Sequence, residues 1–173
     1  STTITGSFRM TQSFLGRRGI AVAPHSLASE AALRVLRDGG NALEAMIAAA
    51  ASIAVVYPHM NSIGGDGFWV IGGPSGPLQG IDASGASAAA ATLDNYAKRG
   101  VSGSIPFRGG VAALTVAGTV SGWGAAHALA QQWGGRLPLS RLLEDATWYA
   151  REGIPVTHSQ WACTTAKQAE LAP

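Results

Sequence analysis

The sequence predicts an α+β fold, because helix-like segments closed by glycines flank two strand-like segments in one chain of 173 residues. The strand-like segments are 67–73 and 78–83, and a turn-forming run joins them as a hairpin. Apolar residues make up 47% of the chain and charged residues only 13%. We therefore expect a piece of a larger assembly, with part of its surface covered by another chain or domain.

Composition also excludes several classes of protein. The net charge of +2 and the absence of a long basic run argue against a nucleic-acid partner. The longest apolar stretch, 45–57, is shorter than the roughly 20 residues that a membrane-spanning helix needs. A single cysteine, Cys163, excludes a disulfide framework. No signal peptide is visible at the start, so we expect a cytoplasmic protein, with the periplasm as the alternative.

The first elements are set by proline and glycine. Residues 1–18 are polar and lack periodicity, which predicts an N-terminal arm, and residues 19–173 form the rest of the chain. Segment 19–24 reads as a short buried strand closed by Pro24. A helix over 26–38 follows and stops at two glycines.

A second helix is expected over 42–56. Asn41 and Glu44 have the spacing of a capping box at its start, and Pro58 ends it. The helix is nearly all alanine, valine and isoleucine, so it can pack closely against a sheet or another helix.

The second half of the chain is expected to be mostly helical. A short helix over 92–100 precedes a loop over 101–111. Longer helices are predicted over 117–133, opened by Thr119 or Ser121, and over about 140–151. The tail over 154–173 is weakly patterned.

The loop PHMNSIGGDGFW, residues 58–69, is the most unusual stretch. A phosphate-binding loop would need a lysine after its glycines, or glycines between a strand and a helix, and neither is present. A metal site would need more ligands than His59 and Asp66, and the four histidines are scattered. We expect no metal and no cofactor. The remaining interpretation is a packing turn, with the wall of a pocket as the alternative.

No nucleophile can be assigned from local motifs. Cys163 lies in a polar stretch without a base nearby, and we interpret it as structural. The segment 118–122 lacks the spacing of a nucleophile elbow.

Two blocks of the sequence resemble the γ-glutamyltranspeptidase family. Block 20–68 contains helix, GGNA, helix, proline and GGDGF in the order typical of the family. Block 117–156 resembles the family's PGTV segment and the helix that follows it, although Ala117 replaces the usual proline.

The resemblance implies a four-layer αββα N-terminal-nucleophile hydrolase fold, of which this chain is a part. In that family a precursor cuts itself into a large and a small chain. The N-terminal threonine of the small chain attacks an amide carbonyl, with its own α-amine as the base. This chain resembles only the front of the large chain, so we expect no catalytic residue on it. The partners implied are that small chain and a small-molecule amide, and two such heterodimers can pair.

The substrate-binding residues depart from the family pattern. Typical γ-glutamyl enzymes carry D-F-R-E after the hairpin, and the arginine grips the α-carboxylate of the substrate. Here the arginine position is Ser84 and the glutamate position is Gly85. A serine cannot replace the charge-assisted contact of an arginine with a carboxylate. Arg108 is the nearest positive partner this chain offers, and the alternative is an ordinary exposed arginine.

Three residues of the glycine loop are further candidates for substrate binding. Asn61 offers donor and acceptor groups to a small polar substrate, and His59 and Asp66 can face the same pocket. The alternative is that Asp66 caps a turn and His59 is packed.

We therefore predict an amidohydrolase of this family that is poor on γ-glutamyl substrates, with a small acidic amide such as oxamate favoured. A cephalosporin-acylase-like enzyme or a true γ-glutamyl hydrolase or transferase are the enzyme alternatives. A non-catalytic structural subunit is the alternative from another class.

Overall fold

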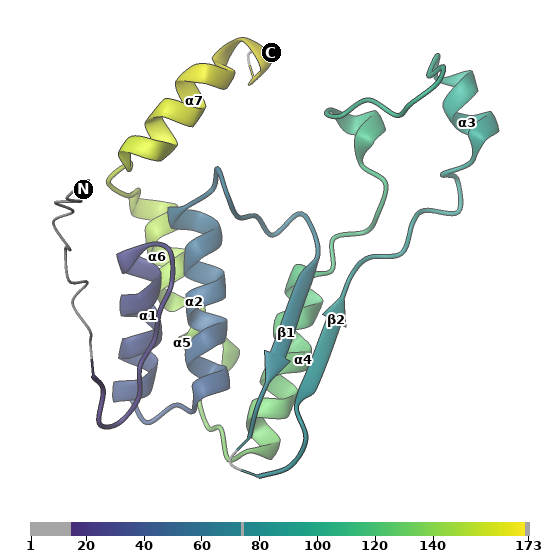
Figure 1. Ribbon diagram of the computed structural model, residues 1–173. Coiled ribbons are helices and arrows are strands. Elements are labelled where there is room, and N and C mark those ends of the chain that lie inside the picture. The colour runs from purple at the N-terminus through teal and green to yellow at the C-terminus, as the bar shows by residue number, and fades with distance from the viewer. Residues whose placement is uncertain (1–14, 74, 172–173) are drawn as a thin grey trace, which may run out of the picture.

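A computed structural model describes residues 15–73 and 75–171. Most of the predicted N-terminal arm, residues 1–14, lies outside this range. The described part forms a group of helices beside a two-stranded sheet, with a long excursion between β2 and α4 (Figure 1). No helix among the described residues is long and apolar enough to cross a membrane.

Helices α1 and α2 form where the sequence places them. Helix α1 spans Ser26–Arg37 and α2 spans Ala42–Val56. The capping box at α2 is confirmed, because Asn41 and Glu44 each accept a hydrogen bond from the other's backbone N–H. Gly39 has φ +85°, a conformation that favours glycine and ends α1.

The expected strand over 19–24 is wrong. The segment forms no strand, and its apolar residues Ile20 and Val22 are 58% and 76% exposed. A short apolar run predicts a buried strand only if a neighbouring strand is available, and none of the described residues supplies one.

The hairpin is confirmed, with strand β1 at Gly67–Ile71 antiparallel to β2 at Gln79–Ala83. Its inner face packs against helix α4, Thr119–Gln132, which also contacts α2. Its outer face carries Phe68 and Val70, which are 70% and 83% exposed. The described residues therefore supply one helical layer and one sheet layer.

The remaining helices follow the prediction in part. Helix α3 spans Leu93–Lys98, and a 3₁₀ turn occupies Gly110–Ala112. The single helix expected over 140–151 is two, α5 at Leu139–Leu142 and α6 at Glu144–Glu152. The weakly patterned tail contains α7, His158–Leu171.

The core lies among α1, α2, α4, α5 and α6. Its largest fully buried apolar side chains are Ile47, Leu142, Val35 and Val56. Many of the other core residues are alanines of α1 and α2, which let these two helices approach closely.

Candidate functional site

The glycine loop is anchored on the N-terminus of α4. The carbonyl oxygen of Gly65 accepts hydrogen bonds from the backbone N–H groups of Gly118 and Thr119, at 3.0 and 2.9 Å. The Thr119 hydroxyl donates to the same oxygen at 2.7 Å and to the Asp66 carbonyl oxygen at 3.0 Å. Two of the N–H groups at the start of α4, those of Gly118 and Thr119, are therefore satisfied by the loop. The interpretation of the loop as a packing turn fits this arrangement.

Asp66 links the glycine loop to the turn after β2. Its Oδ1 accepts a hydrogen bond from the backbone N–H of Gly85 at 3.0 Å. In the same turn, the backbone N–H of Ser84 donates to Asp82 Oδ1 at 2.9 Å. Hydrogen bonds from the Ser84 hydroxyl and backbone N–H hold the pKa of the Asp82 carboxyl below its ordinary value. Two successive N–H groups, those of Ser84 and Gly85, are thus each held by a carboxylate.

Glycine is required where these segments meet. A Cβ at Gly85 would lie 1.5 Å from the carbonyl oxygen of Val116, and a Cβ at Gly118 would lie 1.9 Å from that of Ala83. Both contacts are with backbone, which cannot move aside as the end of a flexible side chain can. The glycine loop, the turn after β2 and the start of α4 therefore form one tightly packed junction.

A cleft of about 290 Å³ opens beside this junction. Asn61, Asp66 and Thr119 supply polar groups to its wall, and Trp123 supplies an apolar surface. The remaining lining residues come from α2, the glycine loop and β1: Met46, Ala50, Ile53, Ala54, Ser62, Gly67, Phe68 and Trp69. A largely apolar cleft with a few convergent polar groups is the usual form of a small-molecule site.

His59 and Arg108 lie in a different cleft, of about 510 Å³, against α7. His59 packs edge-on against Tyr57 at a ring distance of 4.2 Å, and its Nε2 lies 3.2 Å from Ser159 Oγ. Arg108 forms an ion pair with Glu170 of α7. This environment of His59 fits the packed-histidine alternative.

The five predicted binding residues therefore do not share one site. Asn61 and Asp66 line the same cleft, and Ser84 is connected to it through the Asp66 contact with Gly85. His59 and Arg108 line the second cleft. Cys163 is exposed in that second cleft.

Sequence reasoning missed the role of Thr119 and Gly85. Thr119 was expected only to open a helix, whereas its side chain fixes the glycine loop from 53 positions away. Where two backbone segments pack closely, the sequence has a glycine. The spacing of residues does not show which distant segment the glycine packs against.

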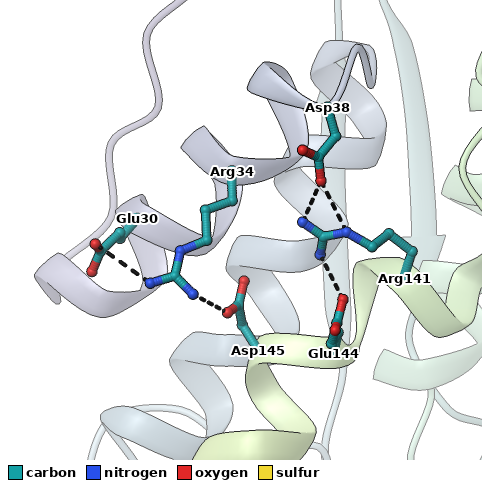
Figure 2. A network of polar contacts seen from close by, with 6 residues as sticks. All are labelled: Glu30, Arg34, Asp38, Arg141, Glu144 and Asp145. Atoms are coloured by element: carbon teal, nitrogen blue, oxygen red, sulfur yellow. Dashed lines mark hydrogen bonds and ion pairs between the residues drawn. The ribbon is translucent and has the colours of Figure 1, made fainter.

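A second missed feature is the polar network between α1 and the α5–α6 pair (Figure 2). Arg34 donates to Asp145 at 2.7 Å, and the charge of Asp145 raises the pKa of Arg34. Arg141 donates to Asp38. These contacts join helices, and none of these residues lines the cleft beside the glycine loop. Among residues 15–73 and 75–171, no group of three or more metal-ligating side chains is present.

Comparison with known proteins gives relatives of several activities. The chain is 57% identical over 163 residues to a protein of Klebsiella pneumoniae subsp. pneumoniae named oxamate amidohydrolase proenzyme, covering 94% of this chain and 30% of the relative. It is 41% identical over 152 residues to the glutathione hydrolase-like YwrD proenzyme of Bacillus subtilis, covering 87% of this chain and 28% of that protein. The chain thus spans less than a third of the length of these curated relatives.

Solved structures show the same fold. The γ-glutamyltranspeptidase of Helicobacter pylori superposes with a TM-score of 0.78 at 31% identity, over 91% of this chain and 44% of that chain. The cephalosporin acylase of Bacillus halodurans superposes with a TM-score of 0.73 at 30% identity, over 97% of this chain and 32% of that one.

The sequence profile of the Gamma-glutamyltranspeptidase family matches residues 28–173, nearly the whole of the described chain. This match confirms the resemblance that the two sequence blocks indicate. The superpositions confirm the expected fold, an α+β chain that is part of the N-terminal-nucleophile hydrolase fold. The chain belongs to the γ-glutamyltranspeptidase family.

Proposed function

We propose that this chain is the front part of the large chain of an amidohydrolase that cleaves a short acidic amide such as oxamate. The observation that carries the proposal is Ser84. By its resemblance to the family motif it stands at the position of the carboxylate-gripping arginine, and its turn has the carboxylates of Asp66 and Asp82 as hydrogen-bond acceptors. The higher identity to the Klebsiella oxamate amidohydrolase than to the glutathione hydrolase-like protein supports the same choice.

The chemistry of the two substrates explains why a serine suits one of them. In a γ-glutamyl amide the α-carboxylate is separated from the scissile carbonyl by a chain of carbon atoms, so it needs a cation at a remote subsite. In oxamate the carboxylate is bonded directly to the scissile carbonyl and does not reach that subsite. The turn offers no cation to the γ-glutamyl carboxylate, because the charged groups that hold it are the carboxylates of Asp66 and Asp82.

The reaction would proceed on a nucleophile outside this chain. The hydroxyl of an N-terminal threonine attacks the amide carbonyl while its own α-amine takes the proton. The tetrahedral intermediate collapses, the C–N bond breaks and the protonated leaving group departs as ammonia. Water then attacks the acyl ester and releases the acid, which for oxamate is oxalate. This chain contributes the walls of the site.

The partner in this proposal is the chain that carries the threonine, in one heterodimer or in a pair of them. The outward side chains of Phe68 and Val70 support it, because a sheet face of this kind is normally covered. An obligate interface of this type buries more than ~2,000 Å².

A cephalosporin-acylase-like activity is the second candidate. The chain superposes along almost its whole length on the Bacillus halodurans acylase, and its cleft has an apolar wall that includes Met46 and Trp123. Such a wall suits a larger acyl group than that of oxamate.

The test is steady-state kinetics of the full-length, processed protein on oxamate, a γ-glutamyl anilide and a cephalosporin amide. We expect kcat/KM to be highest for oxamate. The missing arginine contact is worth roughly 1.5–3 kcal/mol. The value of kcat/KM for the γ-glutamyl anilide should therefore be about one to two factors of ten lower than in a family member that carries the arginine. Efficient γ-glutamyl turnover would refute the proposal, and preference for the cephalosporin amide would favour the second candidate.

A further inference from the structure

We propose that Asp66 is a positioning residue of the acyl site, whose carboxylate fixes the Ser84–Gly85 turn in the place that suits a short acidic amide. The inference rests on the proposed function and assigns a residue to its specificity. It starts from one contact, the hydrogen bond that Gly85 N–H donates to Asp66 Oδ1 at 3.0 Å. This contact spans 19 positions and joins the glycine loop to the end of β2.

The base on which the Asp66 side chain stands is rigid. The carbonyl oxygens of Gly65 and Asp66 are both held by the Thr119 hydroxyl, which is largely buried. Because Thr119 begins α4, the loop backbone is tied to the first turn of a fourteen-residue helix. The Asp66 carboxylate therefore projects from a fixed backbone, as a residue that positions another must.

The other partner in the contact is equally constrained. Gly85 lies so close to the carbonyl of Val116 that no side chain fits there, and the backbone N–H of Val116 donates to Ala86 at 3.1 Å. The turn can thus present only its backbone and the Ser84 side chain to its surroundings. Its N–H at Gly85 is the group that Asp66 holds.

Asp82 and Asp66 have different effects on the turn. Asp82 accepts from the N–H of Ser84, two residues further along the chain, so it sets the internal shape of the turn. Asp66 comes from another segment and also lines the 290 Å³ cleft, so it sets where the turn lies relative to that cleft.

The first experiment compares Asp66→Ala and Asp66→Asn in the full-length, processed enzyme, with Asp94→Ala as a control. Asp94 is an exposed aspartate in the first turn of α3 and does not line the cleft. We expect Asp66→Ala to raise KM for oxamate by about tenfold and to change kcat much less. The amide oxygen of Asp66→Asn still accepts the Gly85 N–H, so its KM should stay within about threefold of wild type.

Two kinetic results would overturn the proposal. One is an unchanged KM in Asp66→Ala, and the other is an Asp66→Asn enzyme as impaired as Asp66→Ala, because the amide retains the hydrogen bond. If the substitutions only disrupted the structure, kcat and the melting temperature would fall together, and Asp66→Asn would be no better than Asp66→Ala. If Asp66→Ala does not fold, Asp66→Ser replaces it, since the shorter side chain does not reach the Gly85 N–H.

The second experiment is hydrogen–deuterium exchange of the peptide that contains Ser84 and Gly85, which needs no substrate. Loss of the contact in Asp66→Ala should speed exchange of the Gly85 amide by about tenfold, and Asp94→Ala should leave it unchanged. If exchange responds but the wild type does not hydrolyse oxamate, the proposed substrate fails and the contact stands. If exchange does not respond, Asp66 does not hold the turn, whatever the substrate.

Discussion

The carboxylate of Glu44 accepts a hydrogen bond from the backbone N–H of Leu137 at 2.8 Å, across 93 positions of sequence. Glu44 is fully buried on α2, and its other oxygen accepts from the backbone N–H of Asn41 at 2.7 Å. The Asn41 side chain donates to the carbonyl of Ala130 at 3.0 Å, near the end of α4. One buried acid thus joins the start of α2 to the connection between α4 and α5.

Glu44→Ala should therefore destabilise the folded protein by about 2–4 kcal/mol, because it leaves two part-buried N–H groups without their acceptor. Denaturant unfolding of the full-length protein measures this. Glu30→Ala is the control, since Glu30 is half exposed in a 3.6 Å pair with Arg34, and such a pair contributes roughly 0–1 kcal/mol. Equal stability of the Glu44 and Glu30 variants would contradict the structural role of Glu44.

Tyr149 should make the fold sensitive to alkaline pH. Burial and the nearby charge of Asp145 raise the pKa of its phenol above its ordinary value of 10.0. The folded state therefore holds the phenol proton more tightly than the unfolded state. This stability is fully present below about pH 10 and is lost as the pH rises through the folded pKa.

Tyr149→Phe should flatten the fall in melting temperature between pH 9 and 11, roughly the interval around the ordinary tyrosine pKa. Tyr96→Phe, which removes a tyrosine of α3, is the matched control. If both variants lose stability with pH as steeply as the wild type, Tyr149 does not titrate with unfolding.

The glycine loop gives the third prediction. Asn61→Ala should lower turnover while the melting temperature changes by only a few degrees, whereas His59→Ala should leave turnover unchanged. The structure gives the two residues different surroundings: Asn61 lines the cleft that contains Asp66, and His59 packs against Tyr57. Activity on oxamate together with thermal melting measures the effect. Full activity of Asn61→Ala would remove Asn61 from the site, and a loss of turnover in His59→Ala would contradict its role as a packed residue.

The sequence predicts those elements of the fold that depend on interactions between residues close together in the chain. The helices with local signals, such as the Asn41–Glu44 capping box and the glycine after α1, are where the sequence places them. The strand expected over 19–24 fails because strand formation needs a partner that local sequence cannot supply. The helix α7 has few buried residues and little periodicity, so its pattern is weak.

In the candidate site, too, the sequence predicts local features but not contacts between distant segments. Ser84 is found by comparing the turn with a family motif, which is a local observation. The contacts of Thr119 with Gly65 and of Asp66 with Gly85 join distant segments through backbone groups, which leave no pattern in the side chains.

Arg108 carries the fourth prediction. It forms an ion pair with Glu170 and lies in the cleft against α7, so it would have to leave Glu170 to bind an anionic substrate. Because Arg108 also lies outside the cleft beside the glycine loop, Arg108→Ala should leave KM for oxamate unchanged, and a rise of about tenfold would instead show that Arg108 binds the substrate carboxylate. Lys98→Ala, an exposed cation at the end of α3, is the control. An unchanged KM would make Arg108 an ordinary surface arginine.

We infer that this chain supplies the walls of a site whose nucleophile is the N-terminal threonine of another chain. Mass spectrometry and N-terminal sequencing of the purified full-length protein test it most directly. We expect two tightly associated chains, the one that contains these 173 residues and a smaller one that begins with threonine. Replacing that threonine by alanine should leave one uncut, inactive chain. A fully active protein made of a single uncut chain, or a second chain that begins with another residue, would rule out an N-terminal threonine as the nucleophile.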